Sequence, residues 1–215
     1  MGAFVPAYDL CVMKKRLWLF DFDGTVTTAD TLLLFIRHAC GTARFLTGFA
    51  LFSPLLVLMK LHLYPNDKAK QRLFAWFFKG MEEKEFNTRC RAFAADSRHI
   101  LRPEAMRLIA QYINDGDEVC IVSASIDNWV EPFFHDFNDG GQRAPVIIGT
   151  QVEVQDGVLT GRFLTDNCYG AEKVHRVEAL FPQRNDYYIT AFGDSRGDKE
   201  MLDYADERHF RPFRR

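Results

Sequence analysis

Two carboxylates stand two residues apart in the run Asp21-Phe22-Asp23-Gly24-Thr25. A carboxylate can attack phosphorus and form an aspartyl-phosphate, which splits one difficult hydrolysis into two easier steps. A neighbouring acid can protonate the leaving alcohol and afterwards activate water. The pair Asp21 and Asp23 is therefore suited to phosphoryl transfer through a covalent intermediate.

Two more acids, Asp194 and Asp198, follow an apolar run near the other end of the chain. Several carboxylates in one pocket repel each other unless a cation neutralises them. Mg²⁺ prefers oxygen ligands and shares its coordination shell with substrate phosphate. The acids therefore predict a Mg²⁺ site, provided that the fold brings these two parts of the chain together.

Short apolar runs predict four buried strands that alternate with helical segments. Such alternation is typical of an α/β fold with a doubly wound, mostly parallel sheet, whose ligands sit beyond the carboxyl ends of the strands. Asp21, Ser123 and Asp194 each follow a predicted strand, so we expect them to share one site. The predicted strands cover residues 17–20, 119–122, 146–148 and 187–192; a hairpin is expected over 152–163 and a helix over 126–138.

These residues resemble the motifs of the haloacid-dehalogenase-like (HAD) hydrolases. The run that begins at Asp21 looks like the first motif, and Ser123 after its strand looks like the second. Lys173 looks like the third, and the run Gly193-Asp194-Ser195-Arg196-Gly197-Asp198 looks like the fourth. The motifs come in the family's order over almost the whole chain, and the resemblance implies a HAD-like Rossmann-type core.

The resemblance also implies a role for each matching residue. Asp21 is the expected nucleophile and a Mg²⁺ ligand, and Asp23 is the expected general acid and base, with its backbone carbonyl on Mg²⁺. A carboxylate at Asp23 favours phosphoryl transfer, because the dehalogenase branch has no acid there and uses no metal. The other expected roles are phosphoryl binding by Thr25, Ser123, Ala124 and Lys173, Mg²⁺ binding by Asp194, and support of the metal or orientation of Lys173 by Asp198.

The segment between the first two motifs is mostly helical by its pattern. It resembles the helical cap of the phosphoserine-phosphatase-like branch, which implies a cap over residues 31–100 and a catalytic core over 13–30 and 101–215. The amino-acid phosphatase of that branch carries Glu where this chain has Asp30. Two interpretations of Asp30 stay open, which are a substrate contact and the N-cap of a helix that begins near Thr31.

Residues 45–59 contain no charged residue and are interrupted by Gly48 and Pro54. The segment is shorter than the roughly 20 residues that span a bilayer, so it predicts either a buried helical hairpin or a surface that touches membrane. It also resembles the apolar cap segment of the bacterial phosphatidylglycerophosphatase C group, which shares an Asp at the Asp30 position. Cations that would meet anionic head groups or remain solvated are Arg37, Lys60, Lys68, Lys70 and Arg72.

The whole chain has 215 residues and a net charge of −2, so no overall field favours nucleic acid. Its five cysteines are scattered without a CxxC pair, which favours a reducing compartment. We therefore expect a cytoplasmic protein, with a peripheral position at the inner face of the membrane as the alternative. Met13 is a second possible start residue, and 211–215 are expected to fray.

The sequence predicts a Mg²⁺-dependent phosphomonoester hydrolase that acts on a small-molecule or lipid phosphate ester. Three alternatives stay open at this point. The first is a phosphatase for phosphatidylglycerophosphate at the membrane surface. The second is transfer of the phosphoryl group to an acceptor other than water, and the third is a non-catalytic module that binds phosphate.

Overall fold

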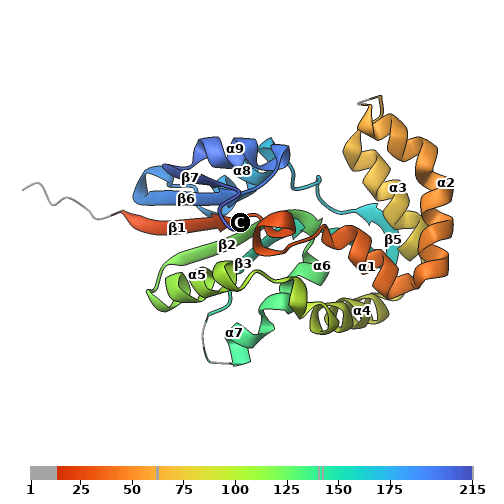
Figure 1. Cartoon of the computed structure of the whole chain (residues 1–215), viewed down its shortest axis with the longest axis horizontal. Helices are drawn as coiled ribbons and strands as arrows, with labels where there is room; N and C mark the ends of the chain where they lie inside the picture. The colour runs from red at the N-terminus through yellow and green to blue at the C-terminus, as the bar shows by residue number, and fades with distance from the viewer. Residues whose placement is uncertain (1–13, 62, 140, 142, 215) are drawn as a thin grey trace, which may run out of the picture.

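The computed structural model describes residues 14–61, 63–139, 141 and 143–214, so Met13 lies outside the described residues. Its centre is a five-stranded sheet in the order β3-β2-β1-β6-β7, in which every neighbouring pair is parallel (Figure 1). The predicted α/β class is confirmed. The strands are β1 Lys15–Phe20, β2 Glu118–Ile126, β3 Val146–Thr150, β6 Tyr187–Gly193 and β7 Glu207–Phe210.

Successive side chains of a strand point to opposite faces of the sheet, so β1 contributes to two separate cores. Trp18 and Phe20 pack in the core on the side of α5, whereas Leu17 and Leu19 pack in the core on the side of α8 and α9. Figure 1 shows α5 on one face of the sheet and α8 and α9 on the other. These helices span Pro103–Asn114 (α5), Ala171–Leu180 (α8) and Lys199–Tyr204 (α9).

Four helices lie together beyond one end of the sheet (Figure 1). The hairpin predicted over 152–163 is confirmed. It packs on the third of these helices, and just after that helix the Gly80 N–H donates to the Leu159 carbonyl at 2.9 Å. Phe74 and Phe78 of the same helix are fully buried. The elements are α1 Thr31–Cys40, α2 Thr42–Lys60, α3 Asn66–Phe78, α4 Glu83–Asp96, β4 Val152–Gln155 and β5 Val158–Phe163.

The helical hairpin predicted within 45–59 is wrong, because α2 is a single helix. Gly48 does not interrupt α2 but permits its contact with α3, since a Cβ there would lie 2.4 Å from Cζ of Phe77. Pro54 has no N–H for the carbonyl of Ala50. The hydroxyl of Ser53 donates to that carbonyl instead, at 2.8 Å, so the helix continues through the proline.

The segment 42–59 is also not buried: only 6% of it lies inside the structure. By length and composition α2 is the one helix within the described residues that is apolar enough to cross a membrane. Phe45, Phe49 and Phe52 pack inward against the main core, whereas Leu46, Leu51 and other apolar side chains face outward. The helix therefore has an inner face bound to the protein and an outer face that is apolar and uncovered.

Two other predicted elements differ from the structure. The helix expected over 126–138 is divided into α6 (Asp127–Val130), a 3₁₀ turn and α7 (His135–Asp139), because Pro132 has no N–H to continue an α-helical ladder. Strand β7 is not among the predicted strands, because it is short, begins with two charged residues and lies at the edge of the sheet.

Candidate active site

Asp21 directly follows β1, and its backbone N–H donates to the carbonyl of Phe192 on β6 at 2.9 Å. This bond holds the end of β1 beside the end of β6, from which the chain continues to Asp194. Both carboxylates are buried, with 5% of Asp21 and 7% of Asp194 exposed. The structure thus brings together two acids that the sequence places far apart.

A helical turn over Phe22–Val26 carries the chain away from Asp21. Gly24 adopts a φ of +81°, and a Cβ at this position would lie 2.4 Å from Oδ2 of Asp194. Only glycine permits this approach, because a side chain would be strained and would displace the carboxylate. Thr25 is buried in the same turn, and its hydroxyl is the only buried side-chain polar atom of the described residues without a hydrogen-bond partner.

Lys173 lies at the centre of a buried ion network in the site. Its Nζ donates to Oδ1 of Asp21 at 2.7 Å and to Oδ1 of Asp198 at 2.6 Å. The third hydrogen goes to the carbonyl of Val122 on β2, at 2.7 Å. Lys173 is 1% exposed, so all three of its hydrogens are used within the protein.

Burial and charge act in opposite directions within this network. Burial raises the pKa of Asp21 to about 7, although the nearby ammonium of Lys173 lowers it. Burial would lower the pKa of Lys173, but the carboxylates of Asp21 and Asp198 more than offset this effect and raise it. Burial would raise the pKa of Asp198, but Lys173 and hydrogen bonds from Ser195 hold it below its ordinary value. Lys173 and Asp198 are therefore charged.

Asp198 is held from both sides. Its Oδ2 accepts hydrogen bonds from the backbone N–H of Asp194 at 3.1 Å and from the N–H and hydroxyl of Ser195 at 2.9 Å each. Its Oδ1 accepts from Lys173. Of the two expected roles of Asp198, this geometry is suited to the orientation of Lys173.

Carboxylate oxygens of Asp21, Asp194 and Asp198 all lie within 4.8 Å of one another. A set of donors made only of oxygen is the type that Mg²⁺ prefers. Burial raises the pKa of Asp194, and the guanidinium of Arg214 opposes this effect, so a cation stabilises the ionised carboxylate. The residues therefore fit a divalent cation with oxygen ligands.

The expectation that the C-terminal residues fray is wrong for 211–214, and residue 215 lies outside the described residues. Arg214 forms an ion pair with Oδ2 of Asp194, and Nε of Arg211 donates to the carbonyl of Asp194 at 3.1 Å. The ring of Phe213 stacks on Phe192 of β6 with centroids 6.0 Å apart. This segment therefore packs beside the acid cluster.

Ser123 does not end a strand as predicted but lies inside β2, where the pairing with β3 shifts register between Val122 and Ile126. The shift follows the last residue that β2 pairs with β1, so Ser123 still lies beyond the end of β1. Its buried Oγ accepts the N–H of Ser125 at 3.0 Å. The carbonyl of Ala124 accepts from the hydroxyl of Thr150 at 2.9 Å.

Asp23 is half-buried and lies beside the network, and among the described residues it forms no ion pair. Its Oδ1 accepts the N–H of Thr31 at 2.7 Å, and its Oδ2 accepts the hydroxyl of Ser125 at 2.5 Å. Burial and the nearby charge of Asp30 raise the pKa of Asp23, and these hydrogen bonds oppose the rise. Asp30 accepts the N–H of Leu32 at 2.9 Å and caps α1, so the N-cap interpretation is confirmed, and it also lines the cavity described next.

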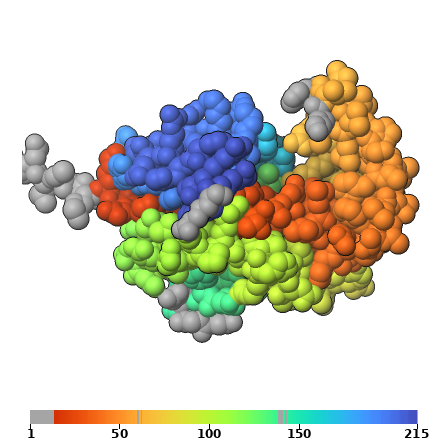
Figure 2. Space-filling model, viewed as in Figure 1, coloured from red at the N-terminus to blue at the C-terminus, as the bar shows by residue number. Residues whose placement is uncertain are grey.

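A cavity of about 570 Å³ connects these groups with the helices. Figure 2 shows the surface hollowed between the α8–α9 side of the core and helices α2 and α3. The acids Asp21 and Asp23 line one part of the cavity, and apolar side chains line the other. The apolar lining consists of Leu32, Leu33, Phe49, Leu56, Met59 and Leu73.

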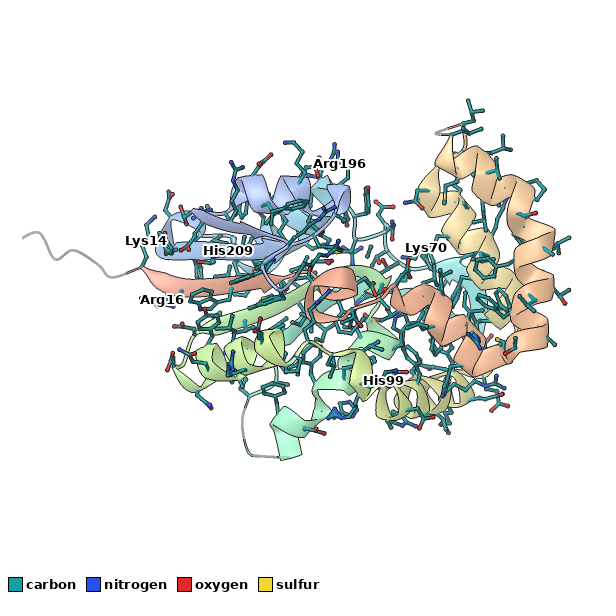
Figure 3. All side chains as sticks on the ribbon, in the orientation of Figure 1. Lys14, Arg16, Lys70, His99, Arg196 and His209 are labelled. Carbon is teal, nitrogen blue, oxygen red and sulfur yellow. The ribbon has the colours of Figure 1, made fainter. Side chains whose placement is uncertain are left out.

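Lys70 of α3 reaches from the helices toward the core (Figure 3). Its Nζ donates to the carbonyl of Ala124 and, at 3.2 Å, to Oδ1 of Asn167. Burial lowers the pKa of Lys70 to about 8, although the nearby acids Asp23 and Asp30 raise it. The sequence suggested a solvated lysine or a lipid contact at this position, but Lys70 lines the cavity.

Sequence reasoning did not identify Ser125, Lys70 or Arg214 as site residues. A serine two positions after Ser123 has no local signal, and Lys70 follows the pattern of an ordinary helical lysine. The charge of Arg214 near the end of the chain gives no indication of its partner. Only the tertiary fold brings these residues to the acids.

Comparison with known proteins gives the family. A family model described as haloacid dehalogenase-like hydrolase matches residues 18–203. The chain therefore belongs to the haloacid dehalogenase-like hydrolase family, as the motifs predicted. Protein CicA of Caulobacter vibrioides is similar to it, with 34% identity over 206 residues that cover 94% of this chain and 88% of CicA.

Solved structures share the fold. A protein of unknown function from Bordetella pertussis Tohama I matches with a TM-score of 0.77 and 20% identity, over 91% of this chain and 89% of that one. A phosphoserine phosphatase from T. onnurineus matches with a TM-score of 0.56 and 22% identity, over 95% of this chain and 87% of that one. The predicted likeness to the phosphoserine-phosphatase-like fold is thus confirmed.

Proposed function

We propose that this protein is a Mg²⁺-dependent phosphomonoester hydrolase that acts through an aspartyl-phosphate on Asp21. The observation that carries the proposal is the buried network of Asp21, Lys173 and Asp198, which opens on a cavity beside Asp23. In this proposal residues 13–30 and 101–215 form the catalytic core. Residues 31–100 form a cap that supplies the apolar part of the cavity.

In the first step a carboxylate oxygen of Asp21 attacks phosphorus. The new O–P bond forms as the bond from phosphorus to the leaving oxygen breaks, and the electron pair goes to that oxygen. Asp23 supplies the proton that makes it a neutral alcohol. Lys173 stays bonded to Asp21 and stabilises negative charge on the transferring group.

In the second step Asp23, now ionised, removes a proton from a water molecule. The water oxygen attacks phosphorus, the bond to Asp21 breaks, and inorganic phosphate leaves. The Asp21 carboxylate and the Asp23 carboxylic acid are then restored. This cycle needs one residue that serves as acid and then as base, and the hydrogen-bonded carboxyl of Asp23 is suited to that role.

The phosphoryl oxygens need donors. Ser123 Oγ accepts the N–H of Ser125, so its own hydrogen is available to a phosphoryl oxygen. We assign the same role to the backbone of Ala124 and to the unpartnered hydroxyl of Thr25, whereas Lys173, whose three hydrogens are already used, binds the phosphoryl group through its positive charge. Mg²⁺ would be held by Asp21, Asp194 and the backbone carbonyl of Asp23, and when bound it supplies positive charge to the phosphoryl group. We also assign to Asp30, which lines the cavity, a contact with the leaving group.

The test is release of phosphate from p-nitrophenyl phosphate with Mg²⁺. Asp21→Asn removes the nucleophile, so we expect a loss of at least about a thousandfold in kcat, and no phosphoryl adduct in the intact mass of the quenched enzyme. The control is Asp156→Asn, an exposed change in the β4–β5 turn at a φ of 52°, which asparagine tolerates. Equal activity of Asp21→Asn and the unaltered protein would exclude the mechanism.

A second candidate function is hydrolysis of a lipid phosphate at a membrane surface, and the observation that favours it is α2. Its outer face exposes Leu46, Leu51, Val57 and Leu58, while its other side contributes Phe49, Leu56 and Met59 to the cavity. One helix thus connects an uncovered apolar surface with the apolar part of the candidate site. Because α2 packs on the protein through its inner face, the surface is suited to peripheral contact with lipid.

Sedimentation with vesicles of phosphatidylglycerol, phosphatidylcholine and phosphatidic acid tests this second function. We expect Leu51→Glu with Val57→Glu to abolish sedimentation and hydrolysis of phosphatidic acid in the vesicles, but to leave p-nitrophenyl phosphate hydrolysis unchanged. Leu180→Glu is the control, because Leu180 is equally exposed on α8, away from α2. Absence of sedimentation by the unaltered protein would leave soluble esters as the substrates.

A further inference from the structure

A chain of buried hydrogen bonds ends on the carboxylate of Asp23. Nε1 of Trp129 donates to Oγ1 of Thr31 at 3.2 Å, and Oγ1 of Thr31 lies 3.2 Å from Oγ of Ser125. The hydroxyl of Ser125 donates to Oδ2 of Asp23 at 2.5 Å. Trp129 and Thr31 are 0% exposed and Ser125 is 2% exposed, so water does not replace these bonds.

The chemistry of the four groups fixes the direction of the chain. An indole N–H only donates, so Thr31 accepts from Trp129. The Asp23 carboxyl accepts at Oδ2, and as an acid it carries its proton on another lone pair, so the hydrogen of Ser125 points to Asp23. The hydrogen of Thr31 is then the one between Thr31 and Ser125. Every hydrogen in the chain therefore points toward Asp23.

The same residues also restrain Asp23 and Ser123 from the backbone. The N–H of Thr31, at the start of α1, donates to Oδ1 of Asp23 at 2.7 Å. The N–H of Ser125 donates to Oγ of Ser123 at 3.0 Å. Thr31 therefore holds one carboxylate oxygen directly and the other through Ser125, and Ser125 is shared by Asp23 and Ser123.

We propose that Ser125 and Thr31, anchored by Trp129, are positioning residues that fix the orientation of the Asp23 carboxyl for proton transfer to the leaving group. The inference rests on the proposed function, in which Asp23 is the general acid. Each oxygen of Asp23 accepts one of these hydrogen bonds and keeps a second lone pair, which can bind the proton that is transferred. Without the hydroxyl of Ser125, the carboxyl is held at only one oxygen and turns about its last side-chain bond.

The test compares phenyl phosphate with p-nitrophenyl phosphate. The two esters have similar shape, but phenolate is the stronger base and needs a proton to leave, whereas p-nitrophenolate leaves without one. The measured quantity is the ratio of kcat/KM for phenyl phosphate to that for p-nitrophenyl phosphate. It reports the steps up to departure of the leaving group, so slow hydrolysis of the intermediate does not affect it.

We expect Ser125→Ala and Thr31→Val to lower this ratio about tenfold, because the loss falls on the ester that needs the proton. Thr31→Ser keeps a hydroxyl at the same place and is expected to restore the ratio. A residue with a purely structural role would lower both kcat/KM values alike and leave the ratio unchanged. An unchanged ratio in both Ser125→Ala and Thr31→Val would overturn the inference.

Asp23→Asn separates this inference from the proposed function. If Asp23→Asn lowers the ratio but Ser125→Ala does not, the acid role stands and the positioning role is wrong. If Asp23→Asn leaves the ratio unchanged, the acid role fails and the inference fails with it. Should Ser125→Ala not fold, as judged by its thermal unfolding, the pair Thr31→Val and Thr31→Ser decides the question. The valine variant keeps the β-branched shape without the hydroxyl, and the serine variant keeps the hydroxyl without the β-branch.

Discussion

The two sides of the cavity differ in how their charged groups are bonded. On the sheet side, Lys173 uses its three hydrogens on two carboxylates and a carbonyl, and Asp198 accepts four hydrogen bonds. On the helical side, the hydrogen-bond acceptors of Lys70 among the described residues are neutral, on Ala124 and Asn167, and Lys70 shares its cavity with apolar side chains. The sheet side is suited to one fixed reaction, whereas the helical side is suited to selection among substrates.

The largest effect is expected from Lys173→Met, which removes the centre of the buried ion network on the sheet side. The change leaves Asp21 and Asp198 buried without their cation, and loss of one partner of a buried ion pair costs about 3–5 kcal/mol. We expect kcat to fall about a thousandfold and the unfolding temperature to drop. The control is Lys199→Met, whose ion pair with Asp203 is exposed to solvent and contributes little to stability. Near-normal kcat in Lys173→Met would show that the reaction does not depend on the ion network of the sheet side.

A smaller and different effect is expected from Lys70→Met. Its ammonium lies in the cavity without an acidic hydrogen-bond partner in the described residues, so it is available to attract the anionic part of a substrate. We expect KM to rise about tenfold with kcat nearly unchanged, measured on any ester that the unaltered protein hydrolyses. Lys68→Met, on the exposed side of the same helix, is the matched control. A loss in kcat equal to that of Lys173→Met would remove the distinction between the two sides.

The charge on the sheet side also predicts a pH dependence without Mg²⁺. Burial raises the pKa of Asp21 from 3.8 to about 7, so between these values the folded protein binds more protons than the unfolded chain. The free energy of unfolding therefore falls as pH rises through this window. Asp21→Asn lacks this titration, so its advantage in unfolding temperature over the unaltered protein should grow from about pH 5 to about pH 8 in EDTA.

Mg²⁺ reverses this dependence for the unaltered protein. Bound cation favours the ionised carboxylates, so addition of Mg²⁺ at pH 8 should raise the free energy of unfolding by about 2.7 kcal/mol at a hundred times the Kd, and the unfolding temperature should rise with it. Asp194→Asn should reduce the rise, and Asp156→Asn should keep it. If the difference in unfolding temperature between Asp21→Asn and the unaltered protein in EDTA is the same at about pH 5 and about pH 8, Asp21 is not the titrating group.

The smallest effect is expected on the helical side from Ser53→Ala. The change removes the hydroxyl that donates to the Ala50 carbonyl left free by Pro54. Because this part of α2 is exposed, water replaces much of the bond, and we expect a loss of about 0.5 kcal/mol in the free energy of unfolding. The activity on p-nitrophenyl phosphate should not change. A clear fall in kcat would show that α2 affects the sheet side as well.

The same difference between the two sides determines what could be predicted from the sequence. The positions of Asp21 and Asp194 follow from short apolar runs that end at polar residues, because parallel strands deliver their carboxyl ends to one edge. The helical side depends on tertiary packing. Gly48 predicts an interruption of α2, and only the close approach of Phe77 explains why a glycine stands within a continuous helix.

Ser125 and Arg214 make contacts in the site that the sequence does not predict. Ser125 is one hydroxyl among many in the sequence, and its value comes from the register shift in β2 that turns it toward Asp23. Arg214 follows a short edge strand that carries no strong strand pattern, so its ion pair with Asp194 had no local signal. Both are contacts between elements distant in sequence, which periodicity does not encode.

The position of β1 in the sheet has a consequence for the order in which the protein opens. Leu17 to Phe20 are paired with β2 on one side and with β6 on the other. Their amide protons should exchange with deuterium only when the whole domain unfolds, whereas those of the exposed helix α2 should exchange through local fluctuations. Mild heat or denaturant would then loosen the helical side of the cavity while the strand that carries Asp21 is still folded.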